Sequence, residues 1–199
     1  ADPDIALITS IGASHLEFLE NEDGVFQEKK VLFDRPLQLR LFPAGDARFR
    51  SYQGKTFGDN MESDYYYYEI RSTDAITSFR VNNEKYEIPT GYRAFVANAT
   101  AAIAVACELG IPADLIREGL LQPLACELRM ELRISGGRLL MLDCYNANPQ
   151  SMLAAINYWQ QREPQRPHVA ILGDMLELGS RSADLHREIG IRLVDCPDS

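Results

Sequence analysis

The last third of the chain repeats one pattern twice, and this pattern limits the possible folds more than any other feature. The apolar run at 139–142 precedes a polar turn and a helical stretch that places Met152, Ala155 and Trp159 on one face. A second apolar run, at 168–175, predicts a buried strand and is followed by another polar turn and helical stretch. Strands that alternate with helices form parallel sheets. The sequence therefore predicts an α/β fold.

The first 121 residues predict a second, mixed set of elements. Residues 4–11 are nearly all apolar or β-branched and predict a strand buried on both faces. Residues 13–50 show a less regular pattern, whereas three short antiparallel strands are expected between 54 and 88. Alanine-rich residues 95–110 predict a helix, and a second, shorter helix follows at 112–121.

The junction of the two halves is marked by a change of pattern. The helical segment stops at Pro123, and residues 129–144 then predict a hairpin that turns at Gly136-Gly137. We expect a boundary near 122–128, which divides the chain into a domain at 1–124 and a domain at 125–199.

Charge and composition exclude several classes of function. The formal net charge is −9, whereas a protein that binds the nucleic-acid backbone needs a basic face. Binding along a nucleic acid is therefore not expected. The four cysteines lie far apart with no C-x-x-C spacing, which predicts reduced thiols and neither a zinc site nor a disulfide framework. We find no apolar run of membrane-spanning length and no secretory start, and we expect a cytoplasmic protein.

Polar side chains gather after the predicted strands, where ligands bind in α/β sheets. Asp143, Tyr145, Asn146 and Asn148 follow the run at 139–142, just before the helix that begins near Pro149. The amides of that helix would form an anion site. Capping of the helix by short polar side chains explains the same residues equally well. A second cluster contains Gly173, Asp174, Glu177 and Gly179.

Two other features have simple structural interpretations. His15 follows the first predicted strand, where a lone histidine is more often a hydrogen-bonded residue than a metal ligand. Gly54-Lys55-Thr56 resembles the end of a phosphate-binding loop, but Phe49 stands where that motif requires a glycine. We interpret 54–56 as a turn.

Several motifs together resemble the Mur ligase family. "DCYNANPQSMLAAI" (143–156) and "AILGDMLELGSRSADLHREIG" (170–190) resemble the start of the family's C-terminal domain. "DIALITSIGASHLEFL" (4–19), "EDGVFQEKKVLF" (22–33) and "NATAAIAVACELGIP" (98–112) resemble segments of its central domain. The resemblance implies a partial central domain, a parallel sheet with helices and small antiparallel strands, followed by a partial Rossmann-like C-terminal domain.

The resemblance also implies an activity. Tyr145 to Pro149 is similar to the motif of family members that join D-alanyl-D-alanine to UDP-N-acetylmuramoyl-tripeptide in peptidoglycan precursor synthesis. These ligases use ATP and Mg²⁺ to convert the tripeptide carboxylate into an acyl phosphate, which the amine of the dipeptide attacks. The N-terminal substrate domain and the phosphate-binding loop of the family have no counterpart in the sequence. We therefore expect a fragment that is inactive by itself.

Seven residues fall at positions to which the resemblance assigns a role. His15 falls at a magnesium-binding histidine and Lys29 at a lysine that the family carbamylates. Asn98 falls at an adenine contact, and Arg129 and Asp143 fall near the phosphates and the ribose. Asn146 and Asn148 fall at the polar turn that the resemblance places between the nucleotide and the dipeptide.

Departures from the family pattern support a different hypothesis. Ala94 and Phe95 replace a histidine and an asparagine before the alanine-rich helix, and Val31 replaces a glutamate after Lys29. A degenerate, non-catalytic Mur-like module that binds a nucleotide or a partner protein would tolerate these changes. An unrelated Rossmann-type domain also fits the β-α-β-α pattern but lacks G-x-G-x-x-G.

Overall fold

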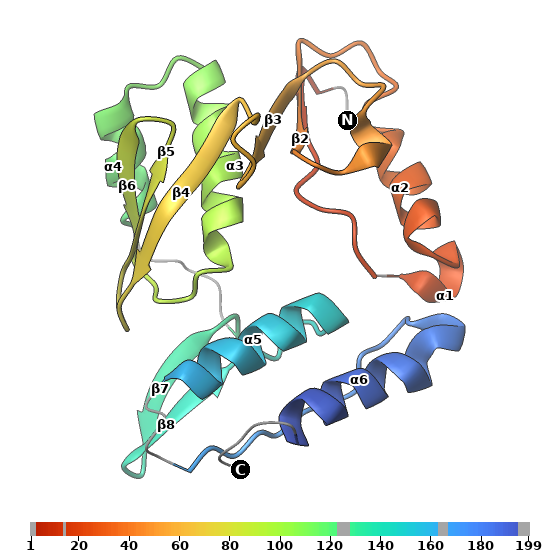
Figure 1. Ribbon diagram of the computed structural model, residues 1–199, viewed down its shortest axis with the longest axis vertical. Helices are drawn as coiled ribbons and strands as arrows, with labels where there is room; N and C mark the ends of the chain where they lie inside the picture. Colours follow the sequence, from red (N-terminus) through yellow and green to blue (C-terminus); the bar gives the residue numbers. More distant parts are fainter. Residues whose placement is uncertain (1–2, 14, 123–127, 163–166, 195–199) are drawn as a thin grey trace. The chain divides into compact units, whose positions relative to one another are not determined.

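The computed structural model describes residues 3–13, 15–122, 128–162 and 167–194, and they form two compact units (Figure 1). Unit 1 contains residues 1–11 and 26–124, and unit 2 contains residues 12–25 and 125–199. The predicted boundary around Pro123 lies outside the described residues. The division into 1–124 and 125–199 stays a prediction, and residues 12–25 group with unit 2.

Unit 1 contains a six-stranded mixed sheet whose strand order follows the sequence. The strands are β1 (Ile5–Leu7), β2 (Leu39–Pro43), β3 (Lys55–Gly58), β4 (Tyr65–Ser72), β5 (Thr77–Val81) and β6 (Glu84–Ile88). Strands β1 to β4 pair in parallel, and β4 to β6 pair antiparallel. The predicted α/β class, with parallel strands and a small antiparallel part, is confirmed.

Two apolar cores stabilise this sheet because its side chains pack against helices. Helices α3 (Phe95–Glu108) and α4 (Ala113–Leu120) cover the antiparallel strands, where the core is centred on Phe79, Val96 and Ile103. The second core joins β1 and β2 to helix α2 (Glu22–Lys30) and the 3₁₀ turn η1 (Ala47–Phe49). Phe26, Phe33, Phe42 and Phe49 form this core, with ring centroids 5.1–6.0 Å apart.

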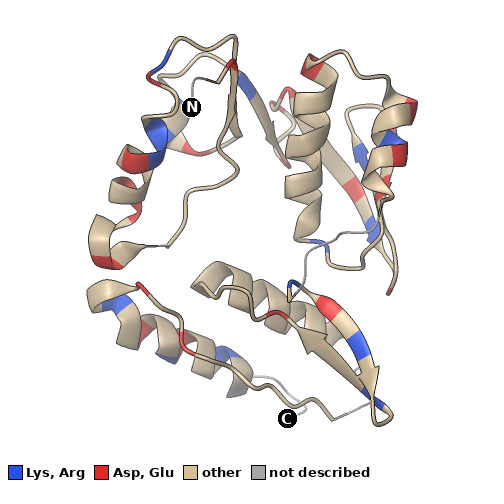
Figure 2. Cartoon of the chain, turned by 180° about the vertical axis from the view of Figure 1, so that it is seen from behind, with Lys and Arg blue, Asp and Glu red and all other residues tan. Residues whose placement is uncertain are grey.

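Charge distinguishes the two long helices around the sheet. Helix α3 has no charged residue before Glu108 and is almost without coloured segments in Figure 2. Helix α2 carries acidic residues in its first turn and Lys29 and Lys30 in its last turn, which suits the helix dipole. The uncharged sequence of α3 allows it to pack closely on the sheet, whereas α2 exposes a charged face.

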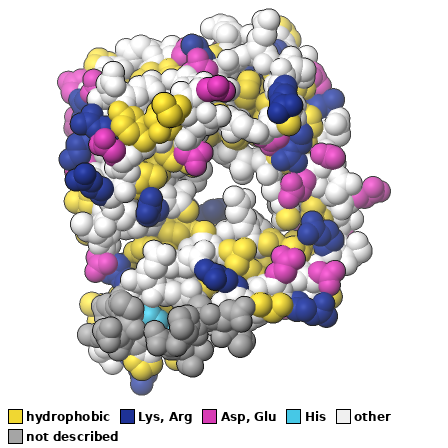
Figure 3. Space-filling view, in the orientation of Figure 1, with side chains coloured by type: hydrophobic (Ala, Val, Ile, Leu, Met, Phe, Trp, Pro, Cys, Tyr) yellow, Lys and Arg dark blue, Asp and Glu magenta, His cyan; other side chains and the backbone are white. Residues whose placement is uncertain are grey.

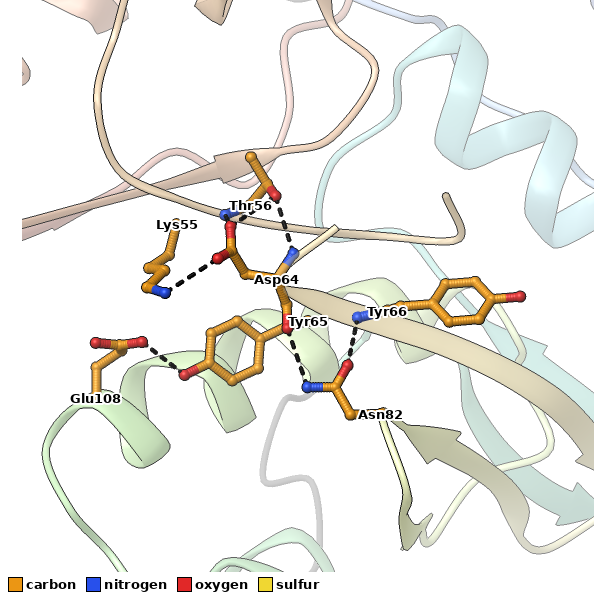
Figure 4. A network of polar contacts seen from close by, with 7 residues as sticks. All are labelled: Lys55, Thr56, Asp64, Tyr65, Tyr66, Asn82 and Glu108. Carbon is orange, nitrogen blue, oxygen red and sulfur yellow. Dashed lines mark hydrogen bonds and ion pairs between the residues drawn. The ribbon is translucent and has the colours of Figure 1, made fainter. Parts of the chain in front are cut away.

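A polar network holds the connection between β3 and β4, which is unusually short for a parallel pair (Figure 4). Asp64 accepts hydrogen bonds from Lys55 Nζ (3.0 Å) and from the amide and hydroxyl of Thr56 (2.9 and 3.0 Å). Burial raises the pKa of Asp64, but these bonds outweigh it and hold the pKa below its ordinary value. Lys55 and Thr56 are the first residues of β3. The prediction of a turn at 54–56 is therefore wrong for these two residues.

The described residues of unit 2 form helices and one hairpin. Its elements are α1 (Leu16–Leu19), β7 (Glu131–Ser135), β8 (Arg138–Leu142), α5 (Pro149–Gln161), η2 (Gly179–Arg181) and α6 (Ser182–Val194). The predicted hairpin is confirmed, because β7 and β8 pair antiparallel and turn at Gly136-Gly137. Helices α5 and α6 bury Ala155, Ile156, Leu185 and Ile189.

The prediction of a buried strand at 168–175 is wrong. No residue of this segment belongs to a strand, and the side chains of Val169 and Ile171 are 79% and 95% exposed. Hydrophobic side chains reach the molecular surface in several places (Figure 3). An apolar run forms a strand only where a neighbour supplies backbone hydrogen bonds, and the described residues place no strand beside this run.

Local signals explain the start of α5. Asn148 is the N-cap residue in an extended conformation, and its Oδ1 accepts from Ser151 N at 2.9 Å. Ser151 Oγ accepts in turn from Asn148 N at 3.2 Å, which completes a capping box. Pro149 occupies the first helical turn, where its missing N–H has no cost.

Asn148→Ala is expected to lower the free energy of unfolding of unit 2 by about 1 kcal/mol, because it removes the cap. Chemical denaturation monitored by the fluorescence of Trp159, which lies in α5, measures this loss. Asn146→Ala is the matched control, since Asn146 Oδ1 accepts from the next amide, Ala147 N, at 2.9 Å and does not cap the helix. Equal losses in the two variants would contradict the capping role.

Candidate functional site

The polar turn at 143–148 joins β8 to α5 in unit 2, as the sequence predicts. Asn148 binds the backbone of its own helix, and Asn146 accepts from the neighbouring amide of Ala147. Capping is therefore the role that the structure shows for Asn148.

Arg129 lies beside this turn in a constrained segment. Its guanidinium group lies over the ring of Tyr145, 4.2 Å from the ring centroid. The residues on both sides, Leu128 and Met130, have positive φ angles of 59° and 51°. Such angles are uncommon outside glycine, and they persist only where surrounding contacts hold them.

Two hydrogen bonds hold that segment against the turn. Asp143 Oδ1 accepts from Met130 N at 3.2 Å, and Leu128 O accepts from Tyr145 N at 3.2 Å. The structure therefore brings three predicted residues of the polar turn, Asp143, Asn146 and Asn148, together with Arg129. A cation beside a carboxylate and a helix N-terminus is suited to a phosphorylated ligand that also carries hydroxyl groups.

His15 precedes α1 and contacts a residue far along the chain. Its Nδ1 forms a hydrogen bond with Glu177 Oε2, and the two side chains are 58% and 43% exposed. Glu177 also belongs to the wall of a cavity of about 660 Å³, which Glu17, Asp174, Ser182 and His186 help to line. The second predicted polar cluster, 173–179, therefore lies next to His15.

His186 holds the loop beside this cavity. Its Nδ1 donates to Ser182 O at 2.7 Å, and its Nε2 accepts from Met175 N at 3.0 Å. These two bonds require a neutral ring with the proton on Nδ1. The spacing Ser-x-x-x-His signals the family, but it does not predict this structural role.

Lys29 and Asn98 lie in unit 1. Lys29 Nζ donates to Ser10 O, in the loop that follows β1, at 3.0 Å. Burial lowers the pKa of Lys29 below its ordinary value. Asn98 is exposed in the first turn of α3. The seven predicted residues thus form two groups, Lys29 and Asn98 in unit 1 and the other five in unit 2.

Within the described residues, we find no group of three or more His, Cys, Asp or Glu side chains arranged to hold a metal ion. The two residues to which the family resemblance assigns a magnesium role are His15 in unit 2 and Lys29 in unit 1. His15 is exposed and has one ring nitrogen engaged by Glu177. Lys29 has a lowered pKa, and the neutral amine is the form that reacts with CO₂ to give a carbamate.

Two predictions from composition can be compared with the described residues. Cys107 and Cys144 are exposed free thiols, and Cys126 and Cys196 lie outside the described residues. Across the parts of the chain that the structure describes, each helix is too short or too polar to cross a bilayer.

Two family models match the chain. The Mur ligase middle domain matches residues 1–106, and the Mur ligase glutamate ligase domain matches residues 128–196. UDP-N-acetylmuramoyl-tripeptide–D-alanyl-D-alanine ligase from Bacillus subtilis (strain 168) is 31% identical over 96% of this chain and 43% of its own length. The ligase of the same name from Escherichia coli (strain K12) is 29% identical over 94% of this chain and 44% of its own length.

Solved structures agree with these matches. A crystal structure of MurF from Acinetobacter baumannii has a TM-score of 0.86 and 28% identity, covering 98% of this chain and 45% of that chain. MurF from Thermotoga maritima in complex with ADP shares the fold, with a TM-score of 0.79 at 24% identity, over 97% of this chain and 47% of that chain. The chain thus spans less than half the length of these relatives. The middle-domain model matches more than half of the residues of this chain, so the chain belongs to the Mur ligase family.

Proposed function

We propose that the protein containing this chain is an ATP-dependent ligase that joins D-alanyl-D-alanine to UDP-N-acetylmuramoyl-tripeptide. The observation that carries this proposal is the match to ligases of that name over 94–96% of the chain. The grouping of Arg129, Asp143 and the N-terminus of α5 in unit 2 supports it, because a nucleotide phosphate and ribose need these groups.

The reaction has two balanced steps. A carboxylate oxygen of the tripeptide attacks the γ-phosphorus of ATP, and ADP leaves, which gives an acyl phosphate. The amine of the dipeptide then attacks the acyl carbon, loses a proton, and expels inorganic phosphate from a tetrahedral intermediate. Negative charge accumulates in both steps, so positioned cations and amides provide most of the catalysis.

Each residue has a proposed role. Arg129, held over Tyr145, contacts the phosphates, and Asp143 accepts a hydrogen bond from a ribose hydroxyl with the oxygen that does not bind Met130 N. Asn98 contacts the adenine. The turn residues Asn146 and Asn148 border the space between the nucleotide and the incoming dipeptide.

Magnesium is the cofactor that the family implies. The resemblance assigns a metal-binding role to His15 in unit 2 and, as its carbamate, to Lys29 in unit 1. When bound, the ion neutralises phosphate charge and allows a carboxylate to approach the triphosphate. The lowered pKa of Lys29 supports this role, because a larger fraction of its amine is neutral than in an ordinary lysine. The structure supports His15 through its contact with Glu177.

The domain division belongs to the proposal. Residues 1–124 form part of the ATP-binding central domain and residues 125–199 form part of the C-terminal domain, in line with the family matches at 1–106 and 128–196. We place the complete protein in the cytoplasm, where ATP and the UDP-linked precursor are available.

The proposal is tested with the complete protein by measuring phosphate release with magnesium, ATP and both substrates. Asp143→Ala is expected to raise the KM for ATP about tenfold or more, because a hydrogen bond to a charged group contributes about 1.5–3 kcal/mol. Release should require the tripeptide and the dipeptide together. Phosphate release that continues when either substrate is omitted would contradict the proposed reaction.

Asp184→Ala is the matched control for Asp143→Ala. Asp184 is an exposed carboxylate on α6 that pairs with Arg187 at 3.1 Å. The control should leave the KM for ATP unchanged. An unchanged KM in Asp143→Ala as well would remove Asp143 from the nucleotide site.

A second candidate is a non-catalytic Mur-like module that binds a nucleotide or a partner protein. One observation favours it: Ala94, the N-cap residue of α3, makes no side-chain cap hydrogen bond, and Phe95 follows it. The start of α3 therefore lacks the polar side chains that the family places there. Nucleotide binding without phosphate release in the same assay would favour this candidate.

A further inference from the structure

Two turns that lie far apart in the sequence fit against each other in unit 2. His15, in the first turn, has φ 57°, and Glu177, in the second, has φ 61°. Left-handed angles at residues other than glycine cost free energy, and they cluster where surrounding structure requires them. The flanking leucines, Leu16 and Leu178, are 3% and 2% exposed and anchor the turns in the core.

Three contacts join the turns. His15 Nδ1 binds Glu177 Oε2, and Glu17 N donates to Glu177 O at 2.9 Å. Gly179, with φ 56°, lies so close that an added Cβ would be 3.2 Å from Glu17 Cα and 3.3 Å from Leu16 O. The approach of the two backbones therefore fixes the carboxylate of Glu177 beside the ring of His15.

We infer that Glu177 is a positioning residue that holds His15 in one orientation and one tautomer. An ionised carboxylate only accepts hydrogen bonds, so Nδ1 of the neutral ring carries the proton and Nε2 keeps its lone pair. A free neutral histidine in water prefers the opposite tautomer, with the proton on Nε2. Carboxylates often orient metal-binding histidines in this way.

The contact joins the stretches that two different family models match. His15 lies within 1–106, matched by the middle domain, and Glu177 lies within 128–196, matched by the glutamate ligase domain. A residue of the second stretch thereby sets which nitrogen of His15 is free for a cation. The part of this inference that concerns a cation rests on the proposed function, whereas the tautomer does not.

An ordinary surface ion pair, which contributes little to stability, is the alternative. Long-range ¹H–¹⁵N NMR of the ¹⁵N-labelled chain distinguishes the two, because it shows which ring nitrogen carries the proton. The spectrum is recorded at about pH 8, where an unperturbed histidine is mostly neutral. Comparison with a His15→Gln variant assigns the His15 signals.

The other two histidines are internal references. His168 Nε2 donates to Arg162 O at 2.9 Å, which requires the proton on Nε2. His186 carries its proton on Nδ1, because its Nε2 accepts from Met175 N. We expect His15 to show the pattern of His186 and not that of His168. A His15 ring with its proton on Nε2 in the unmodified chain would overturn the inference, whatever the variants do.

Variants of Glu177 test the cause. Glu177→Ala should convert His15 to mainly the Nε2-protonated form, whereas Glu177→Gln should keep the proton on Nδ1, because the amide oxygen still accepts. Asp174→Ala is the control for a neighbouring carboxylate and should leave His15 unchanged. Unaltered signals of His168, which binds Arg162 O, show that each variant is folded. If His15 still carries its proton on Nδ1 in the Glu177→Ala variant, the positioning role is overturned.

A second measurement separates this inference from the proposed function. Mn²⁺, a paramagnetic substitute for Mg²⁺, should broaden the ring signals of His15, and Glu177→Ala should weaken the apparent Mn²⁺ affinity about 10–100-fold. Glu177→Gln should retain most of it. If the tautomer is as inferred but Mn²⁺ leaves His15 sharp, the positioning stands and the magnesium role of His15 fails.

Discussion

Phe79→Ala is expected to lower the free energy of unfolding of unit 1 by about 3–5 kcal/mol. Phe79 lies in β5, is 1% exposed and packs against Tyr86 with ring centroids 6.3 Å apart. It lies at the centre of the core between the antiparallel strands and helix α3. Truncation would remove apolar contacts and leave a cavity that a sheet and a helix cannot close without distortion.

Urea denaturation followed by far-UV circular dichroism measures this loss. The only tryptophan of the chain, Trp159, lies in unit 2, so circular dichroism follows the loss in unit 1 more directly than tryptophan fluorescence. Met61→Ala is the matched control, since Met61 lies in the same unit, is 80% exposed, and its truncation should cost less than about 0.5 kcal/mol. Similar losses in the two variants would show that the core is not centred on Phe79.

Lys29→Met in the complete protein is expected to lower the rate of ligation about 10²–10³-fold, the effect of removing one group that stabilises transition-state charge. Partial burial of its amine holds the pKa of Lys29 below its ordinary value, so the amine is neutral at a lower pH than that of an unperturbed lysine. Because CO₂ reacts with the neutral amine, the carbamate should form at lower pH on Lys29 than on an unperturbed lysine, and acidification should remove it.

NMR of the protein in ¹³C-labelled bicarbonate detects the carbamate carbon directly. Lys29→Met should remove this signal. Lys30→Met, which changes the next residue of α2, should retain both the signal and the activity. Full activity in Lys29→Met, or a carbamate signal that persists in it, would contradict the role proposed for Lys29.

Where a structural feature depends on residues close in sequence, the sequence alone determined it. Helix α5 is an example, because Asn148, Pro149 and Ser151 form its cap and first turn within four residues. The hairpin of β7 and β8 is another, because it turns at two glycines with positive φ angles. The motifs at 143–156 and 170–190 also indicated the Mur ligase family, which the family matches confirm.

Features that depend on partners far along the chain could not be derived in this way. Strand β2 lies in the stretch 13–50, for which the sequence predicted no strand. It forms because its backbone pairs with β1 on one side and β3 on the other. The run at 168–175 is apolar enough for a strand but has none, because strand formation also requires a hydrogen-bonding neighbour.

The candidate site shows the same division. Sequence motifs selected Arg129 and Asp143, but the hydrogen bond between Asp143 and Met130 N and the position of Arg129 over Tyr145 are tertiary contacts. His15 and Glu177 are 162 residues apart, and no local pattern relates them. Sequence determines which side chains are available and how each turn is capped. Only the folded backbone decides which nitrogen of His15 faces a carboxylate, because that choice depends on two left-handed turns that meet in three dimensions.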